Sequence, residues 1–229
     1  MKIHGFQKMT LLDFPGKVAC TVFTAGCNLR CPFCHNAFLV TQLSASAEIS
    51  QTEIIEYITR RKGILDGVCI TGGEPLLDDG VFDFIKAIKQ TGLLVKLDTN
   101  GTFPEKLKRA VGEGLVDYVA MDIKNTPEKY GETVGLEAFD VAPVMESIDF
   151  LLSGTVDYEF RTTVVREFHT EDDIAEIAKR IQRAPRYFLQ NFVDSGNLIG
   201  NNLHGVSADE MLLFQKAAQQ YIVDTKVRG

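Results

Sequence analysis

The chain has 229 residues, 45% of them apolar and 24% charged, which is the composition of a globular protein long enough to bury a substantial core. Its 31 acidic and 24 basic residues give a net charge of −7, which argues against nucleic acid or an anionic membrane as the partner. No apolar run approaches the roughly 18 residues of a membrane span and no signal peptide is evident, so we expect a cytoplasmic protein.

Strands and helices are predicted to alternate along the chain. Short apolar runs predict six strands, at residues 18–24, 67–71, 93–97, 116–121, 158–165 and 187–189. Apolar residues at helical spacing predict a helix after each strand, at residues 52–61, 81–90, 104–111, 141–152, 171–181 and 208–221. This alternation predicts an α/β fold with a parallel sheet and right-handed crossovers. Because six units are too few to close a standard barrel, we expect a partial (β/α)6 TIM-like barrel with an open side, as a single domain over residues 1–229.

Three cysteines, Cys27, Cys31 and Cys34, lie in a short loop after the first predicted strand. Three thiolates at this spacing can hold three irons of a cubane cluster and leave the fourth iron without a protein ligand, the open position that a catalytic metal site needs. A zinc-binding module is the alternative. Its fourth ligand is hard to supply, because His35 is adjacent to Cys34 and no histidine follows at zinc-finger spacing. The pattern therefore favours iron–sulfur over zinc and leaves both open.

The remaining cysteines and most histidines suggest no chemistry. Five cysteines, three of them clustered, do not form the framework of a secreted disulfide protein. Cys20 and Cys69 lie inside predicted strands, and we expect both to be buried small hydrophobic residues. We expect surface or structural roles for His4, His169 and His204.

Other unusual residues also stand where predicted strands end. Gly72-Gly73-Glu74-Pro75 follows the second strand, Asp98-Thr99-Asn100-Gly101 the third, and Asp122-Ile123-Lys124 the fourth. In a parallel α/β barrel the carboxyl ends of the strands lie on one face, where such folds build active sites. Glu159 and Arg161 are two residues apart on the fifth strand, so they share one face of it.

These residues carry a resemblance to a known family. The C-x3-C-x2-C pattern, with the aromatic Phe33 before its last cysteine, resembles that of the radical S-adenosylmethionine (SAM) enzymes. The following His35-Asn36 looks like the activating enzymes of glycyl radical enzymes within that superfamily. Residues 5–8 and 12–17 are similar to the activating proteins of anaerobic ribonucleoside-triphosphate reductase. The resemblance extends from about residue 5 to about residue 192 and is strongest at the cysteine loop and residues 72–75.

The resemblance implies two cofactors, a [4Fe–4S] cluster and SAM. It assigns the cluster to Cys27, Cys31 and Cys34 and implies no catalytic residue beyond the cluster and SAM ligands. The further residues expected to contact the cofactors are Phe33, His35, Gly72, Gly73, Glu74, Pro75, Asp98, Thr99, Asp122, Lys124, Arg161 and Gln190.

Several of these residues have specific expected roles. The family places Phe33 by the adenine and the 72–75 motif by the methionine ammonium, with Glu74 as a possible acceptor. Asp98 and Asp122 are expected to bind the methionine ammonium, a ribose hydroxyl or a nearby cation. As a point charge, Lys124 is expected to pair with the methionine carboxylate. The family implies that Arg161 faces SAM from inside the barrel.

One position departs from the family. Many activating enzymes carry proline, an aromatic residue and histidine after the sixth strand, with the histidine by the adenosine. Here Val193 falls where that histidine would be, and Gln190 or Asn191 is the expected substitute. This departure weakens the similarity to the pyruvate formate-lyase type.

The implied function is reductive cleavage of SAM to a 5′-deoxyadenosyl radical, which takes a hydrogen atom from a glycine of a partner enzyme. The expected partner is an anaerobic ribonucleoside-triphosphate reductase, with an external electron donor such as flavodoxin. The alternatives are activation of pyruvate formate-lyase or another glycyl radical enzyme, radical chemistry on a small molecule, an iron–sulfur electron carrier, and a zinc-binding module.

Overall fold

The computed structural model describes residues 1–42 and 47–228. One sheet of eight strands runs in the order β1 to β8 along the chain. Its strands are β1 Ile3–Thr10, β2 Ala19–Thr24, β3 Gly67–Gly72, β4 Leu94–Thr99, β5 Tyr118–Asp122, β6 Asp157–Val164, β7 Tyr187–Asn191 and β8 Thr225–Arg228. The helices are α1 Ala37–Thr41, α2 Gln51–Arg60, α3 Gly80–Gln90, α4 Pro104–Gly112, α5 Tyr130–Thr133, α6 Ala142–Leu152, α7 Glu171–Arg180 and α8 Ala208–Gln219. No helix in the described part of the chain has the length and apolar character to cross a membrane.

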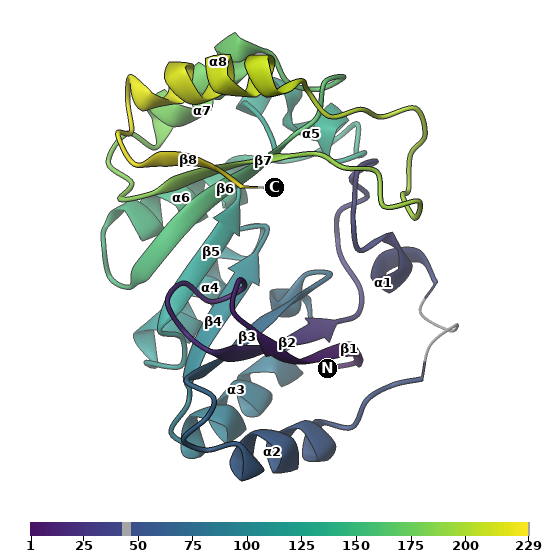
Figure 1. The fold of residues 1–229 in the computed structure, drawn as a ribbon, viewed down its shortest axis with the longest axis vertical. Helices are drawn as coiled ribbons and strands as arrows, with labels where there is room; N and C mark the ends of the chain where they lie inside the picture. The colour runs from purple at the N-terminus through teal and green to yellow at the C-terminus, as the bar shows by residue number, and fades with distance from the viewer. Residues whose placement is uncertain (43–46, 229) are drawn as a thin grey trace.

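The six predicted strands are confirmed as β2 to β7, which run parallel to one another. The six predicted helices are confirmed as α2, α3, α4, α6, α7 and α8, each within two residues of its expected ends. Figure 1 shows these helices on the outer side of a curved sheet. This is the arrangement that right-handed strand–helix–strand units produce.

Two edge strands extend the predicted core. β1 pairs antiparallel with β2, and β8 pairs parallel with β7. They lie at opposite edges of the sheet, so the barrel stays open between them (Figure 1). The expected partial barrel with an open side is therefore confirmed, with eight strands in place of six.

Side chains alternate along the central strands between an apolar outer face and a polar inner face. Val68, Ile70, Val95 and Leu97 are fully buried in the core between sheet and helices. Cys69, Thr71, Lys96 and Asp98 alternate with them and face the barrel interior, and Thr71 and Asp98 line a cavity there. Cys20 is in the core, as predicted.

Cys69 corrects the expectation of a second small hydrophobic residue. It is fully buried, but its sulfur lies 3.7 Å from Asp98 Oδ1 and 3.8 Å from Lys96 Nζ. Burial and the Asp98 charge raise the pKa of this thiol well above its ordinary value. The reason is strand alternation: Cys20 and Cys69 stand on opposite faces of the sheet.

Candidate active site

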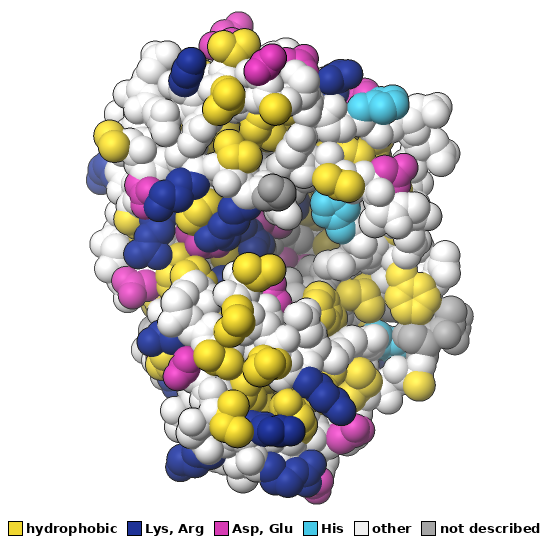
Figure 2. All heavy atoms as spheres, viewed as in Figure 1, with side chains coloured by type: hydrophobic (Ala, Val, Ile, Leu, Met, Phe, Trp, Pro, Cys, Tyr) yellow, Lys and Arg dark blue, Asp and Glu magenta, His cyan; other side chains and the backbone are white. Residues whose placement is uncertain are grey.

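A cavity of about 290 Å³ lies at the carboxyl ends of the strands. Every predicted site residue except Glu74 and Pro75 lines it: Cys27, Phe33, Cys31, Cys34, His35, Gly72, Gly73, Asp98, Thr99, Asp122, Lys124, Arg161 and Gln190. Figure 2 shows a shaded recess near the middle of the molecule, with lysine and arginine side chains gathered to its left. The fold therefore brings residues from six different strand ends into one place, as the parallel topology requires.

The three loop cysteines lie on the wall of this cavity and are largely shielded from solvent. Burial raises the pKa of Cys27 to about 11 and of Cys31 to about 12, and it also raises the pKa of Cys34. Lys124 acts in the opposite direction on all three thiols. Since neutral thiols are favoured here, a bound metal centre would have to drive their deprotonation.

The donor set fits an iron–sulfur cluster. Three soft sulfur donors face one partly enclosed space, and cluster irons are held by cysteine thiolates. Within residues 1–42 and 47–228, no three His, Cys, Asp or Glu side chains converge closely enough to hold a single metal ion. A cubane cluster requires a wider spacing, because each thiolate binds a different iron.

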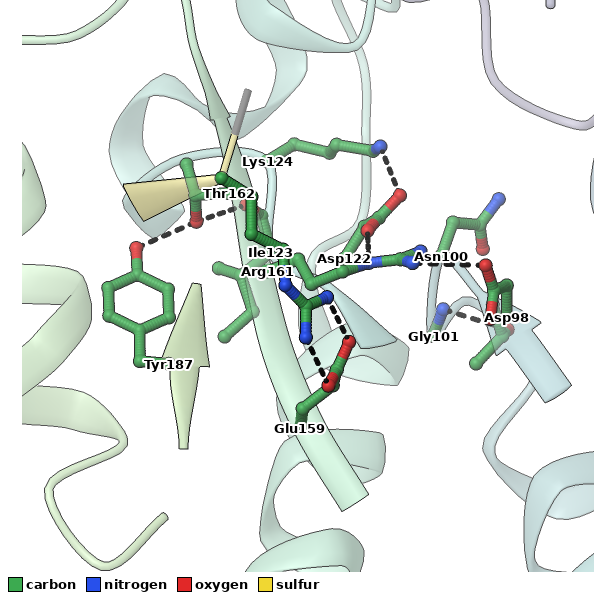
Figure 3. Close-up of polar contacts among 12 residues, drawn as sticks. Asp98, Asn100, Gly101, Asp122, Ile123, Lys124, Glu159, Arg161, Thr162 and Tyr187 are labelled. Atoms are coloured by element: carbon green, nitrogen blue, oxygen red, sulfur yellow. Dashed lines mark hydrogen bonds and ion pairs between the residues drawn. The ribbon is translucent and has the colours of Figure 1, made fainter. Parts of the chain in front are cut away.

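A continuous chain of five charged side chains crosses the barrel interior. Lys96 pairs with Asp98, whose Oδ2 lies 3.0 Å from Arg161 NH1. Arg161 Nε lies 2.8 Å from Asp122 Oδ1, and Lys124 Nζ lies 2.9 Å from Asp122 Oδ2 (Figure 3). Each carboxylate thus stands between two cations, and the chain carries one excess positive charge.

In this row of five charged side chains, the ion pairs affect the pKa values more strongly than burial does. Burial alone would raise the pKa of Asp122, but Arg161 and Lys124 hold it well below its usual range. Arg161 and Lys96 likewise lower the pKa of Asp98 against the effect of burial. Burial would lower the pKa of Lys124, but Asp122 and Cys31 raise it above its usual range. Asp98, Asp122, Lys124 and Arg161 are therefore charged at neutral pH.

Gly72 and Gly73 allow the end of β3 to pack against the cysteine loop. Gly73 N donates to Thr24 O at 2.9 Å, and Glu74 N donates to Gly26 O at 2.8 Å. A Cβ atom on Gly73 would lie 1.9 Å from Gly26 O, and Gly72 has a φ of 116°. No other residue type fits this close backbone approach.

Glu74 is placed differently from the sequence expectation. Its carboxylate does not line the cavity but accepts bonds from Asn100 N at 2.7 Å, Thr99 Oγ1 at 2.9 Å and Leu76 N at 3.0 Å. Burial raises its pKa to about 7, and these hydrogen bonds act against that rise. Glu74 thus ties β3 to the end of β4. Pro75 likewise stands outside the lining and begins a 3-10 helix, Pro75–Leu77.

Aromatic residues close the cavity on the cysteine side. The Phe33 ring packs 5.9 Å from Phe168, and the His35 ring stacks on Phe192 at 5.5 Å. His35 Nε2 lies 3.0 Å from the carbonyl oxygen of Val193. The cysteine loop is therefore joined to the chain segment in which the family histidine was expected.

Sequence reasoning missed several lining residues. Asp13, Thr21, Phe23 and Thr163 contribute to the cavity, and Thr21 Oγ1 donates to Asp13 at 2.5 Å. Alternation along β2 and β6 could have indicated the strand residues, because Thr163 shares the face of Arg161. Asp13 lies in a loop, where no strand alternation indicates which side chains face the barrel.

His169 is structural, as expected. It is buried, its Nε2 lies 2.7 Å from Lys124 O, and Val165 N donates to its Nδ1 at 3.1 Å. Burial lowers its pKa. The histidine therefore fixes the backbone from which Lys124 projects.

Comparison with known proteins agrees with this geometry. The model of the radical SAM superfamily matches residues 21–183. A Methanocaldococcus jannaschii protein, provisionally named a glycyl-radical enzyme activating enzyme, is 32% identical over 99% of this chain and 95% of its own. The pyruvate formate-lyase-activating enzyme of Clostridium pasteurianum is 32% identical over 56% of this chain and 54% of its own.

Solved structures share the fold. SuiB of Streptococcus suis matches with a TM-score of 0.73 at 12% identity, over 91% of this chain and 48% of SuiB. A domain of the pyruvate-formate lyase-activating enzyme of Bacteroides vulgatus matches with a TM-score of 0.59 at 18% identity, over 71% of this chain and 99% of that domain. Radical SAM enzymes use a [4Fe–4S] cluster and SAM. The three cysteine sulfurs and the cavity described above fit these two cofactors. This chain is therefore an oxidoreductase of the radical SAM superfamily and belongs to its group of glycyl-radical-enzyme activating enzymes.

Proposed function

We propose that this enzyme generates a glycyl radical on an anaerobic ribonucleoside-triphosphate reductase in the cytoplasm, with flavodoxin or a similar protein as electron donor. The observation that carries the proposal is the convergence of Cys27, Cys31 and Cys34 on the cavity that also contains the charged chain. The choice of partner rests on the similarity of residues 5–8 and 12–17 to activating proteins of that reductase. Bound together, a [4Fe–4S] cluster and SAM supply a one-electron reductive cleavage that yields methionine and a 5′-deoxyadenosyl radical.

The charged chain would orient the SAM zwitterion. Lys124 is the last of the five charged side chains and lies on the side of the cysteines. Its ammonium is therefore the group placed to pair with the methionine carboxylate. Asp98 and Asp122 each already contact two cations, and the SAM ammonium would have to share or replace one of them. Arg161 fixes both carboxylates and so sets their spacing.

The remaining lining residues would exclude water from the radical. Leu29, Phe33 and Val40 supply apolar walls on the cysteine side. The sheet is open between β1 and β8, and an extended peptide would enter the barrel from that side. A glycine-containing loop of the partner is the substrate that this opening would admit.

The cysteine assignment is tested by anaerobic reconstitution followed by reduction with SAM present. We expect 5′-deoxyadenosine from the wild type, and loss of both cluster absorbance and product from Cys31→Ala. Cys20→Ala is the matched control, because this buried cysteine lies in the core away from the cavity, and it should retain both. Product formation by Cys31→Ala at the wild-type rate would overturn the ligand assignment.

The partner is tested separately. Incubation with SAM, reductant and either anaerobic ribonucleoside-triphosphate reductase or pyruvate formate-lyase should give a glycyl-radical EPR signal only with the reductase. Pyruvate formate-lyase is the second candidate, since its activating enzymes match over half of this chain. A signal with pyruvate formate-lyase alone would contradict the proposed partner and leave the chemistry unchanged.

A further inference from the structure

The side chain of Asn100, at the carboxyl end of β4, reaches the first cysteine of the loop. Its Nδ2 lies 3.8 Å from Cys27 Sγ, within range of an N–H···S hydrogen bond. Asn100 is 73 residues from Cys27 in the sequence and is buried. A second donor to this sulfur, Leu29 N at 3.4 Å, belongs to the cysteine loop itself. Asn100 is therefore a contact to Cys27 that comes from a different part of the fold.

The orientation of the Asn100 amide is fixed by its neighbours. Asn100 Oδ1 accepts from Thr102 N at 3.0 Å and from Thr102 Oγ1 at 2.6 Å. A backbone N–H can only donate, so the oxygen of the amide must face Thr102 and the nitrogen must face the sulfur. The same Nδ2 donates to Asn28 Oδ1 at 3.0 Å, and Asn28 Nδ2 donates to Thr102 Oγ1 at 2.9 Å. The three side chains form a closed ring of hydrogen bonds.

The backbone of Asn100 is held as firmly as its side chain. Its N–H donates to Glu74 Oε2 at 2.7 Å, and the other carboxylate oxygen of Glu74 is bonded to Thr99 and Leu76. Every polar atom of the Asn100 amide thus has a partner, and one N–H is directed at Cys27. The arrangement holds a donor in place next to a residue assigned as a cluster ligand.

We infer that Asn100 is a positioning residue that donates an N–H···S hydrogen bond to the Cys27 thiolate and thereby raises the reduction potential of the cluster. The inference rests on the proposed function, because it requires the cluster on Cys27. A hydrogen bond to a ligand sulfur withdraws negative charge from the cluster and so favours the reduced state, which carries one more electron. Removing the donor should make the cluster harder to reduce.

The test is an EPR-monitored redox titration of the reconstituted enzyme without SAM. Asn100→Leu retains approximate side-chain size but has no donor, and we expect its midpoint potential to be more negative than that of the wild type. Thr102→Val is the matched control. It removes one member of the ring, but Thr102 N still holds Asn100 Oδ1, so the potential should stay near the wild-type value. An unchanged potential in Asn100→Leu, or an equal shift in both variants, would overturn the inference.

A measurement on the wild type covers the case in which Asn100→Leu fails to fold or to load iron. Asparagine labelled with ¹⁵N only in its side-chain amide is incorporated, and the reduced cluster is studied by electron–nuclear double resonance. We expect a ¹⁵N coupling from an amide near the cluster, and its absence would overturn the inference. A wild type that loads no cluster overturns the proposed function itself, whereas a loaded cluster without this coupling overturns only the role of Asn100.

Discussion

Glu74 shows how one buried carboxylate links the strand ends that build the site. It is 1% exposed and receives three hydrogen bonds, two of them from the segment that carries Thr99 and Asn100. Burial still dominates and raises its pKa to about 7 from an ordinary value of 4.5. Between pH 4.5 and about 7 the folded protein therefore binds a proton that the unfolded chain has released.

This difference predicts a specific pH dependence of stability. As pH rises from 4.5 to about 7, the wild type should lose on the order of 3 kcal/mol of unfolding free energy through Glu74, because its folded-state pKa is the higher one. Glu74→Gln has no proton to lose in this window. Urea unfolding of both cluster-free proteins across the window should show the wild type losing stability relative to the variant. A constant difference between the two proteins would mean that Glu74 does not titrate there.

At the scale of elements, the packing of β3 against the cysteine loop depends on Gly73. Because a Cβ atom there would lie 1.9 Å from Gly26 O, Gly73→Ala must push the loop away from the strand. We expect a loss of at least about 2 kcal/mol in unfolding free energy, together with reduced iron content after reconstitution. Gly112→Ala is the matched control, since nothing lies within 4 Å of its Cβ position at the end of α4, and it should be neutral or slightly stabilising. Equal stabilities of the two variants would show that the loop adapts without cost.

The elements that could be predicted from sequence differ physically from those that could not. β2 to β7 lie inside the sheet under covering helices, so residues such as Val68, Ile70 and Val119 form apolar runs that stand out in the sequence. β8, with the sequence Thr-Lys-Val-Arg, is a short edge strand with two exposed residues, and it leaves no such run. β1, the other edge strand, has three consecutive exposed residues, Gln7, Lys8 and Met9. Edge strands are stabilised by pairing with a neighbour, which a pattern of burial does not reveal.

For the molecule as a whole, the topology made the location of the site predictable but not its internal pairing. Parallel strands place their carboxyl ends together, so Asp98 and Asp122 could be assigned to one cavity from sequence order, whereas the inward orientation of Arg161 was expected only from the family resemblance. Which charges pair across the barrel depends on strand stagger and side-chain length. The chain Lys96–Asp98–Arg161–Asp122–Lys124 and the contact of Asn100 with Cys27 therefore emerged only from the structure.

The end of the chain is connected to the barrel interior by one such pairing. Arg228 on β8 forms a two-pronged ion pair with the fully buried Glu159, at 2.8 and 3.1 Å, and Tyr118 OH donates to the same carboxylate. The Arg228 guanidinium also lies 3.3 Å from the centre of the Phe188 ring. β8 is thus attached to β6 through a side chain as well as to β7 through its backbone.

Arg228→Met should cost about 2 kcal/mol or more of unfolding free energy, because it leaves a buried carboxylate without its cation. In a Glu159→Gln background the same substitution should cost much less, since no unpaired charge is created. Urea unfolding of the four proteins of this double-mutant cycle measures the coupling. Lys226→Met is the control on the same strand. Its ion pair with Asp224 is exposed at 2.9 Å, so its loss should cost under about 0.5 kcal/mol. If Arg228→Met costs the same with and without the Glu159 carboxylate, the final strand is held by its backbone pairing alone.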